Sequence, residues 1–145
     1  MIKNSFLISS IIYLSTGLAN ANECIPTAHR TTGTHYEPVT IQKKDIGNSV
    51  VVRGRILAMP ECRPVKNAKV AHWQAGENGI YRDHLRAYLY TDEQGVFEFK
   101  TEWPNLTPPH IHFIINADGF SVLETQWVGH QRVNTITFDM VLERQ

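Results

Sequence analysis

The sequence predicts an all-β protein, an antiparallel β-sandwich assembled from many short strands. Three observations lead to this fold class. Runs rich in β-branched and aromatic residues recur at short intervals, and turn-forming residues separate them. Several runs alternate apolar and polar residues, as strands with one face against a core do. No stretch has the periodicity of a long amphipathic helix, and the sequence shows neither heptads nor an internal repeat.

Residues 1–21 are predicted to be a signal peptide that lies outside the fold. Lys3 gives a weakly basic start, residues 6–18 form an apolar run, and residues 19–21 read Ala-Asn-Ala, a small-x-small cleavage site. The run is too short to span a bilayer comfortably, although an uncleaved N-terminal anchor is the alternative. We therefore expect an exported protein, periplasmic or secreted, with a single mature domain over residues 22–145.

The charge balance limits the classes of partner. The chain carries 14 basic and 14 acidic side chains and has a formal net charge of +0. Nucleic acids and anionic membrane surfaces select strongly basic proteins. We therefore expect neither nucleic acid nor a membrane as the main partner.

Two cysteines, Cys24 and Cys62, lie in the expected mature domain. An oxidising compartment favours a disulfide between them, and two free thiols are the alternative. The bridge would close a loop of about 38 residues, for which the loop-entropy model gives roughly 3–4 kcal/mol. It would hold the start of the N-terminal segment against the body of the domain.

The first half of the domain begins with an irregular segment. Residues 25–38 have no clear periodicity and are expected to form an extended arm that is held by its ends. A strong strand signal covers residues 50–58, and residues 60–64 turn the chain. The next strand is expected at residues 68–75, and the Gly-containing residues 76–79 end it.

The second half contains the remaining strands. Residues 86–91 and 96–101 are predicted to be the two arms of a hairpin with its turn at residues 92–95, and Phe97 and Phe99 face the core. Further strands are expected at residues 110–115, 121–128 and 135–142. In the last run Ile136, Phe138 and Met140 share one face.

The strand after residue 109 carries a His-x-His pair. Side chains two apart on a strand point to the same face, so His110 and His112 would present two imidazoles side by side. Pro108 and Pro109 stiffen the entry to this strand. The spacing suits two ligands of one metal ion, and a half-buried strand with two hydrogen-bonded histidines is the alternative.

Five short motifs follow one another between Cys24 and about Trp127. They are a Cys-x-x-Thr start with Gly33 and Tyr36, a Val-x-Gly strand ahead of Cys62-x-Pro, Trp73-x-Ala ahead of Gly79-x-Tyr81, the segment of residues 91–101, and His110-x-His112 with Gln126. In order and spacing they resemble the intradiol ring-cleavage dioxygenases of the catechol and protocatechuate type, and particularly their short secreted members.

The resemblance implies a β-sandwich enzyme that holds non-haem Fe(III) with two Tyr and two His side chains. Tyr81 matches the first tyrosinate, His110 and His112 match the two imidazoles, and Gln126 matches the Gln that lines the substrate pocket. A phenolate is a hard anion that suits Fe(III), and the ion keeps the phenol ionised below its ordinary pKa of about 10. The implied partners are a small aromatic diphenol and dioxygen, and the implied reaction is oxidative ring cleavage by Lewis-acid activation.

One departure from the family pattern stands out. The family connects the two strands roughly as T-x-x-P-G-x-Y-x-x-R-x-x-H-I-H, whereas here only residues 105–109 separate Pro104 from His110. The second tyrosinate and the Arg that polarises the substrate have no counterpart, and Asn105 or Thr107 occupies the region. Tyr81 and the two histidines alone would form a three-ligand site with open positions for water.

The other aromatic and imidazole side chains have simpler expected roles. Tyr88 and Tyr90 are expected to pack together on the sheet, and Trp73 is expected in the core. The expected roles of the remaining histidines are a surface-loop position for His84, a hydrogen-bonded structural position for His72, and solvated positions for His29, His35 and His130.

Three functions are therefore compared. The first is an exported ferric dioxygenase that cleaves a catechol-type diphenol. The second is a catalytically impaired β-sandwich module that binds a metal or an aromatic ligand, where copper or zinc could replace iron. The third is an interaction domain without a metal. The sequence leaves the diphenol, the fourth ligand and the oligomeric state open.

Overall fold

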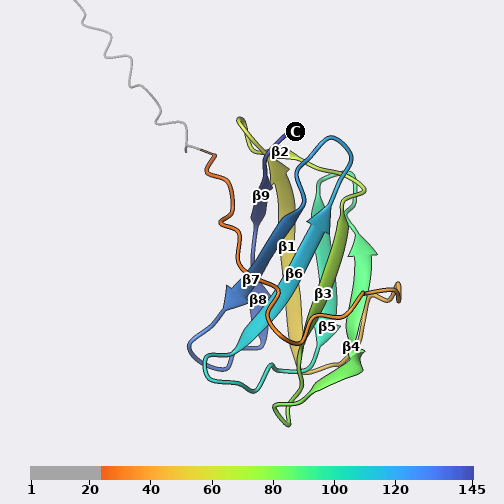
Figure 1. The fold of residues 1–145 in the computed structure, drawn as a ribbon, viewed down its shortest axis with the longest axis vertical. Helices are drawn as coiled ribbons and strands as arrows, with labels where there is room; N and C mark the ends of the chain where they lie inside the picture. Colours follow the sequence, from red (N-terminus) through yellow and green to blue (C-terminus); the bar gives the residue numbers. More distant parts are fainter. Residues whose placement is uncertain (1–23) are drawn as a thin grey trace, which may run out of the picture.

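The structure is a computed structural model that describes residues 24–145. The expected signal peptide, residues 1–21, lies outside the described residues. Within residues 24–145 the chain forms only strands, turns and extended segments, arranged as two packed sheets (Figure 1). This confirms the all-β fold class. No helix suited by length and apolar character to crossing a membrane is found in the described residues.

Nine strands make up the two sheets in the described part of the chain. The first sheet contains β1 (Val50–Ala58), β2 (Arg63–Pro64), β5 (Val96–Thr101), β8 (Thr135–Thr137) and β9 (Met140–Leu142). The second has the order β4 (Tyr81–Tyr90), β3 (Lys69–Ala75), β6 (His110–Asn116) and β7 (Leu123–Val128). The second sheet is antiparallel throughout, whereas β1 pairs in parallel with β8 and β9.

The last predicted strand, residues 135–142, is interrupted in the structure. Asp139 turns its carboxylate onto β1, where it accepts hydrogen bonds from the Arg55 main-chain N–H at 2.8 Å and from the Arg55 guanidinium at 2.8 Å. The Asp139 carboxylate therefore accepts the Arg55 N–H in place of a main-chain carbonyl of a pairing strand. The predicted run divides at this point into β8 and β9. Ile136 and Met140 are both buried, as the shared face predicted.

The predicted hairpin at residues 86–101 is wrong. The turn itself is present, because the Gly95 N–H donates to the Asp92 carbonyl at 3.0 Å. However, β4 and β5 belong to different sheets, so the turn is a corner between the layers. Turn chemistry is satisfied locally in either arrangement. The pairing is instead decided by Phe97 and Phe99, which are 1% and 0% exposed and bring β5 against β1.

The core lies between the sheets and contains one unusual polar side chain. His72 on β3 is fully buried, and its ring lies parallel to that of Phe99 with 3.7 Å between ring centroids. Both of its ring nitrogens lack a hydrogen-bond partner, and burial lowers its pKa to about 3. The predicted structural position is therefore confirmed, but the expected hydrogen bonds are absent from the described residues.

Residues 24–46 form an extended segment, the N-terminal arm, which includes the arm predicted at residues 25–38 and is held at its ends. The predicted disulfide joins Cys24 to Cys62, with 5.4 Å between the Cα atoms. Near the start, the Arg30 N–H donates to the Glu124 carbonyl of β7 at 2.8 Å. Near the end, the Lys43 N–H donates to the Tyr88 carbonyl of β4 at 3.1 Å. Between these points the arm crosses the outer face of the second sheet (Figure 1).

Candidate functional site

Strand β6 carries the two histidines on the outer face of the second sheet. Its alternate residues Ile111 and Phe113 are fully buried in the core, so His110 and His112 point the other way, as predicted. Their ring centroids are 5.0 Å apart. On the neighbouring strands, His112 lies opposite Trp73 of β3 and Gln126 of β7.

Tyr81, the first residue of β4, brings a phenolic oxygen between the two imidazoles. Its Oη lies 3.0 Å from His110 Nε2 and 3.2 Å from His112 Nε2. Three donor atoms that are separated by 29 and 31 residues in the sequence thus meet at one point. The structure brings the three predicted ligands together.

The spacing and chemistry of these donors fit a metal ion. Ligand atoms that bind one ion at about 2.1 Å and at right angles stand about 3 Å apart, and Tyr81 Oη stands at this distance from each of the two Nε2 atoms. In the described part of the chain, no set of three His, Cys, Asp or Glu side chains is placed to hold a metal, so the third donor here is a phenol. One phenolic oxygen and two imidazoles form a donor set that Fe(III) accepts once the phenol is ionised.

The main chain fixes the orientation of His110. The Nδ1–H of its ring donates to the Pro108 carbonyl, with 2.9 Å between the two atoms. A proton on Nδ1 leaves the lone pair of Nε2 directed towards Tyr81 Oη. The second ring nitrogen of a metal-bound imidazole commonly donates its N–H to a carbonyl oxygen in this manner. The prolines that precede β6 therefore supply a hydrogen-bond acceptor in addition to a stiff backbone.

His112 is held by stacking. It is 6% exposed, and its ring lies parallel to the indole of Trp73, with 5.0 Å between centroids and 9° between planes. Burial, with smaller contributions from the charges of His110, His35 and Arg86, lowers the pKa of His112 to about 4. The ring is therefore neutral at pH 7 and has a lone pair available for a cation. Its Nδ1 is buried and has no hydrogen-bond partner among residues 24–145.

Tyr81 is half-buried, and its surroundings oppose ionisation in the absence of a cation. Burial raises the pKa of its phenol, while the positive charge of Arg86 acts in the opposite direction. A bound cation would reverse this balance, because it stabilises the phenolate directly.

The N-terminal arm contributes a side chain that the sequence did not indicate. The ring of His35 is stacked on that of Tyr81, with 4.4 Å between centroids and 10° between planes. His35 is exposed, as expected, and it also packs on Tyr81. Next to it, Tyr36 packs edge-on against Trp73 at 5.4 Å, and Gly33, with a φ of 74°, brings the arm backbone against His112.

Arg86 is a second residue that the sequence did not single out. It lies opposite Trp73 on β4 and is only 9% exposed. Its Nη1 donates to the His35 carbonyl at 2.9 Å, its Nη2 lies 3.8 Å from the Glu37 carboxylate, and its Nε has no partner. A charge between the apolar residues Leu85 and Ala87 was the available signal.

The shortened connection before β6 is attached to a neighbouring loop. The Asn105 side chain donates to the Glu77 carbonyl at 2.8 Å, and the Asn105 N–H donates to the Gly76 carbonyl at 3.2 Å. Arg132 forms two hydrogen bonds with the Glu77 carboxylate and lowers its pKa to about 2. Asn105 is therefore committed elsewhere and does not replace the second tyrosine.

The other aromatic, imidazole and amide side chains named from the sequence do not join the site. Gln126 is half-buried beside His112 and makes no side-chain hydrogen bond to the described residues. Tyr88 and Tyr90 pack edge-on at 5.8 Å, as expected. His84 lies on β4, not in a loop, and is exposed, with its Nε2 3.4 Å from Glu102.

A cavity opens beside the three donors. Its volume is about 460 Å³, and its lining consists of His35, Gly79, Ile80, Tyr81, Leu106 and His110. Volumes of this size accept single-ring ligands. The predicted ligands Tyr81 and His110 therefore face a space that a small aromatic molecule can enter.

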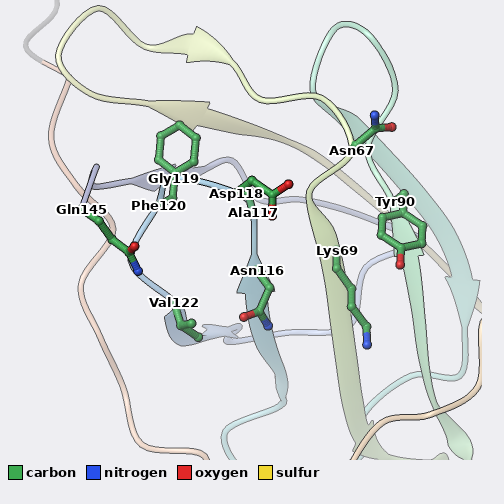
Figure 2. A pocket seen from close by; sticks show the side chains of 10 residues that line it. All are labelled: Asn67, Lys69, Tyr90, Asn116, Ala117, Asp118, Gly119, Phe120, Val122 and Gln145. Carbon is green, nitrogen blue, oxygen red and sulfur yellow. The ribbon is translucent and has the colours of Figure 1, made fainter.

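A groove of about 510 Å³ lies at the other end of the second sheet (Figure 2). Lys69, Tyr90 and Asn116 line it, and they stand at the opposite ends of β3, β4 and β6 from the donors. Strands of this length separate the two places by roughly 20 Å. The polar side chains of this groove are spread along it and do not meet at one point (Figure 2).

The chain is similar in sequence to catechol and hydroxyquinol 1,2-dioxygenases, although no family model matches it. It is 29% identical to catechol 1,2-dioxygenase 2 of Acinetobacter lwoffii, over 57% of this chain and 40% of the relative. It is 28% identical to a hydroxyquinol 1,2-dioxygenase of Rhizobium sp., over 54% of this chain and 37% of the relative. It thus spans about two fifths of the length of these relatives.

Solved structures of dioxygenases share this fold. The dioxygenase domain of a dioxygenase and carbohydrate-binding protein fusion from Streptomyces sp. SirexAA-E matches with a TM-score of 0.74 and 23% identity, over 83% of this chain and 100% of that one. An intradiol ring-cleavage dioxygenase from Tetranychus urticae matches with a TM-score of 0.65 and 27% identity, over 71% of this chain and 65% of that one.

Proposed function

Because the relatives in sequence and the solved structures consistently indicate the intradiol ring-cleavage dioxygenase family, we propose that this chain is an exported dioxygenase that cleaves a catechol-type diphenol. The observation that carries the proposal is the convergence of Tyr81 Oη with the Nε2 atoms of His110 and His112. The disulfide between Cys24 and Cys62 supports export, because such bonds persist in oxidising compartments.

The proposed cofactor is non-haem Fe(III), held by Tyr81, His110 and His112. When bound, a ferric ion supplies Lewis-acid activation of a diphenol that is coordinated through both oxygens. Three protein donors leave positions for those two oxygens. The phenolate of Tyr81 provides the anionic donor, and the two neutral imidazoles complete the protein's share of the site.

Neighbouring residues orient the donors and the substrate. The Pro108 carbonyl holds His110, and the Trp73 indole holds the ring of His112. Gln126 lies beside His112 with an uncommitted amide, and we assign it contact with the substrate. His35 covers the ring of Tyr81 and limits the access of water to it from the arm side.

A second candidate function is a module that binds a metal or an aromatic ligand without cleaving it. The specific observation in its favour is the shortened connection, in which Asn105 is bonded to Glu77 and supplies no second anionic donor. In such a module the His-x-His pair could hold copper or zinc, since the affinity order favours copper.

Dioxygen uptake by the iron-loaded full chain with catechol separates the two functions. The dioxygenase proposal predicts stoichiometric uptake and a dicarboxylic acid product whose mass equals that of the diphenol plus dioxygen. The His110→Ala variant should lose this uptake, while His84→Ala, which removes an exposed imidazole outside the site, should retain it. Iron binding without uptake on any diphenol would instead establish the binding module.

A further inference from the structure

The walls of the cavity beside Tyr81 are largely apolar. Apart from Tyr81 and His110, which would hold the metal, its lining contains one polar side chain, that of His35. Ile80 and Leu106 supply apolar side chains, and Lys and Arg are absent from the lining. A ring bound at the metal would therefore direct its substituents against hydrocarbon.

Leu106 reaches this wall because the connection before β6 is short. In the family that this chain resembles, the connection carries a Tyr and an Arg. Here Leu106 follows Asn105, which is hydrogen-bonded to Gly76 and Glu77. The Leu106 N–H donates to the Pro104 carbonyl at 2.8 Å, which fixes its backbone. At this place the short connection presents the apolar side chain of Leu106 to the cavity.

Arg86 and Arg132 do not line the cavity, and both are committed to other partners. Arg86 lies under the arm and bonds the His35 carbonyl, and Arg132 pairs with the Glu77 carboxylate. The imidazole of His35 lies flat against the ring of Tyr81. A carboxylate on a ring substituent would therefore lose hydration against Ile80 and Leu106 without gaining a Lys or Arg partner from the cavity lining.

We propose that this cavity selects an uncharged diphenol with an apolar ring substituent over a diphenol with a carboxylate at the same position. The proposal rests on the function proposed above and adds its substrate class. Leu106 and Ile80 are the residues that determine this specificity, and they contact the substituent.

Equilibrium binding tests the substrate class without turnover. The iron-loaded full chain is titrated calorimetrically, in the absence of dioxygen, with 4-methylcatechol and with 3,4-dihydroxybenzoate. We expect 4-methylcatechol to bind about tenfold more tightly or more, since a carboxylate placed against an apolar wall loses hydration that the wall does not replace. Leu106→Lys should reverse the preference, and Ile80→Lys, at an exposed position, provides a second variant that leaves the core intact.

Val122→Lys is the matched control. It adds the same charge at an exposed apolar residue of the distant groove (Figure 2) and should leave the ratio of the two dissociation constants unchanged. Equal or tighter binding of 3,4-dihydroxybenzoate by the parent chain would overturn the substrate class alone. If neither diphenol binds, the proposed function falls, and the substrate class falls with it.

Discussion

Two histidines, His72 and His112, lie on opposite faces of the second sheet in similar surroundings, but only one of them lies beside other donor atoms. His72 faces the core and His112 faces the arm, and each lies parallel to an aromatic ring, Phe99 or Trp73 respectively. Burial is the largest cause of the lowered pKa of both, about 3 for His72 and about 4 for His112. Only His112 meets other donor atoms, those of Tyr81 and His110. Burial and a shifted pKa therefore do not identify a functional histidine, whereas convergence of donors does.

The two environments lie one residue apart along β3. His72 stands opposite Phe113 of β6, and the next residue, Trp73, stands opposite His112. Because successive side chains of a strand point to opposite faces, a single step moves from a dry core to a site that the arm covers. The following predictions test this division, from the largest expected effect to the smallest.

Removing the imidazole of His112 should strongly weaken iron binding, and removing the imidazole of His72 should not. The His112→Ala variant loses one of three donors, and we expect its iron affinity to fall by at least about 100-fold, since even indirect partners of a metal contribute 10–100-fold. His72→Leu should retain full iron content. Metal analysis after dialysis measures both, and iron loss from His72→Leu would contradict the division.

His72 should make the stability of the metal-free protein fall at acid pH. Its pKa of about 3 lies below the ordinary value of 6.5, so between these pH values the unfolded chain binds a proton that the folded chain does not. The contribution of His72 to stability is thus complete above pH 6.5 and falls with pH by about 1.4 kcal/mol per unit. His112 acts with the same sign above pH 4.

Urea unfolding at pH 7 and pH 5 measures this effect. The parent chain should lose about 2 kcal/mol for each of the two histidines over this interval, and His72→Leu should lose about half as much as the parent. An unchanged pH dependence in His72→Leu would show that His72 takes up its proton without unfolding.

The smallest expected effect concerns the N-terminal arm, which lies over the outer face of the second sheet. Arg86→Met removes the hydrogen bond to the His35 carbonyl, and bonds to charged groups contribute about 1.5–3 kcal/mol. Amide hydrogen exchange of Arg30 and Lys43, whose N–H groups bond Glu124 and Tyr88, should therefore accelerate about tenfold or more through local opening of the arm. Glu37→Gln is the control, since its exposed pairing with Arg86 contributes little. Unchanged exchange in Arg86→Met would mean that stacking alone holds the arm.

Local patterns in the sequence predicted the fold class and most strands. The alternation at Phe97 and Phe99 and the β-branched run at β1 depend only on neighbouring residues, and both predictions are confirmed. The hairpin prediction failed because the turn at residues 92–95 has the same chemistry whether it joins strands of one sheet or of two. Sheet membership depends on long-range packing, which a short segment does not encode.

The candidate site was predictable where a motif carries it and hidden where the arm supplies it. His110, His112 and Tyr81 were indicated by strand spacing and family resemblance, and the structure brings them together. His35 lies in a segment without periodicity, so nothing in its sequence neighbourhood indicates that it stacks on Tyr81. Arg86 was visible as a charge in an apolar strand, but its partner on the arm was not.

The visible absorption spectrum of the iron-loaded full chain, compared with that of its Tyr81→Phe variant, is the most direct measurement of whether these three donors share one ion. Charge transfer from a tyrosinate to ferric iron requires the phenolic oxygen, so the parent chain should be coloured and Tyr81→Phe colourless. His84→Ala, which leaves the three donors in place, should keep the colour. A colourless parent chain with stoichiometric iron, or a Tyr81→Phe variant that is equally coloured, would contradict the proposed centre.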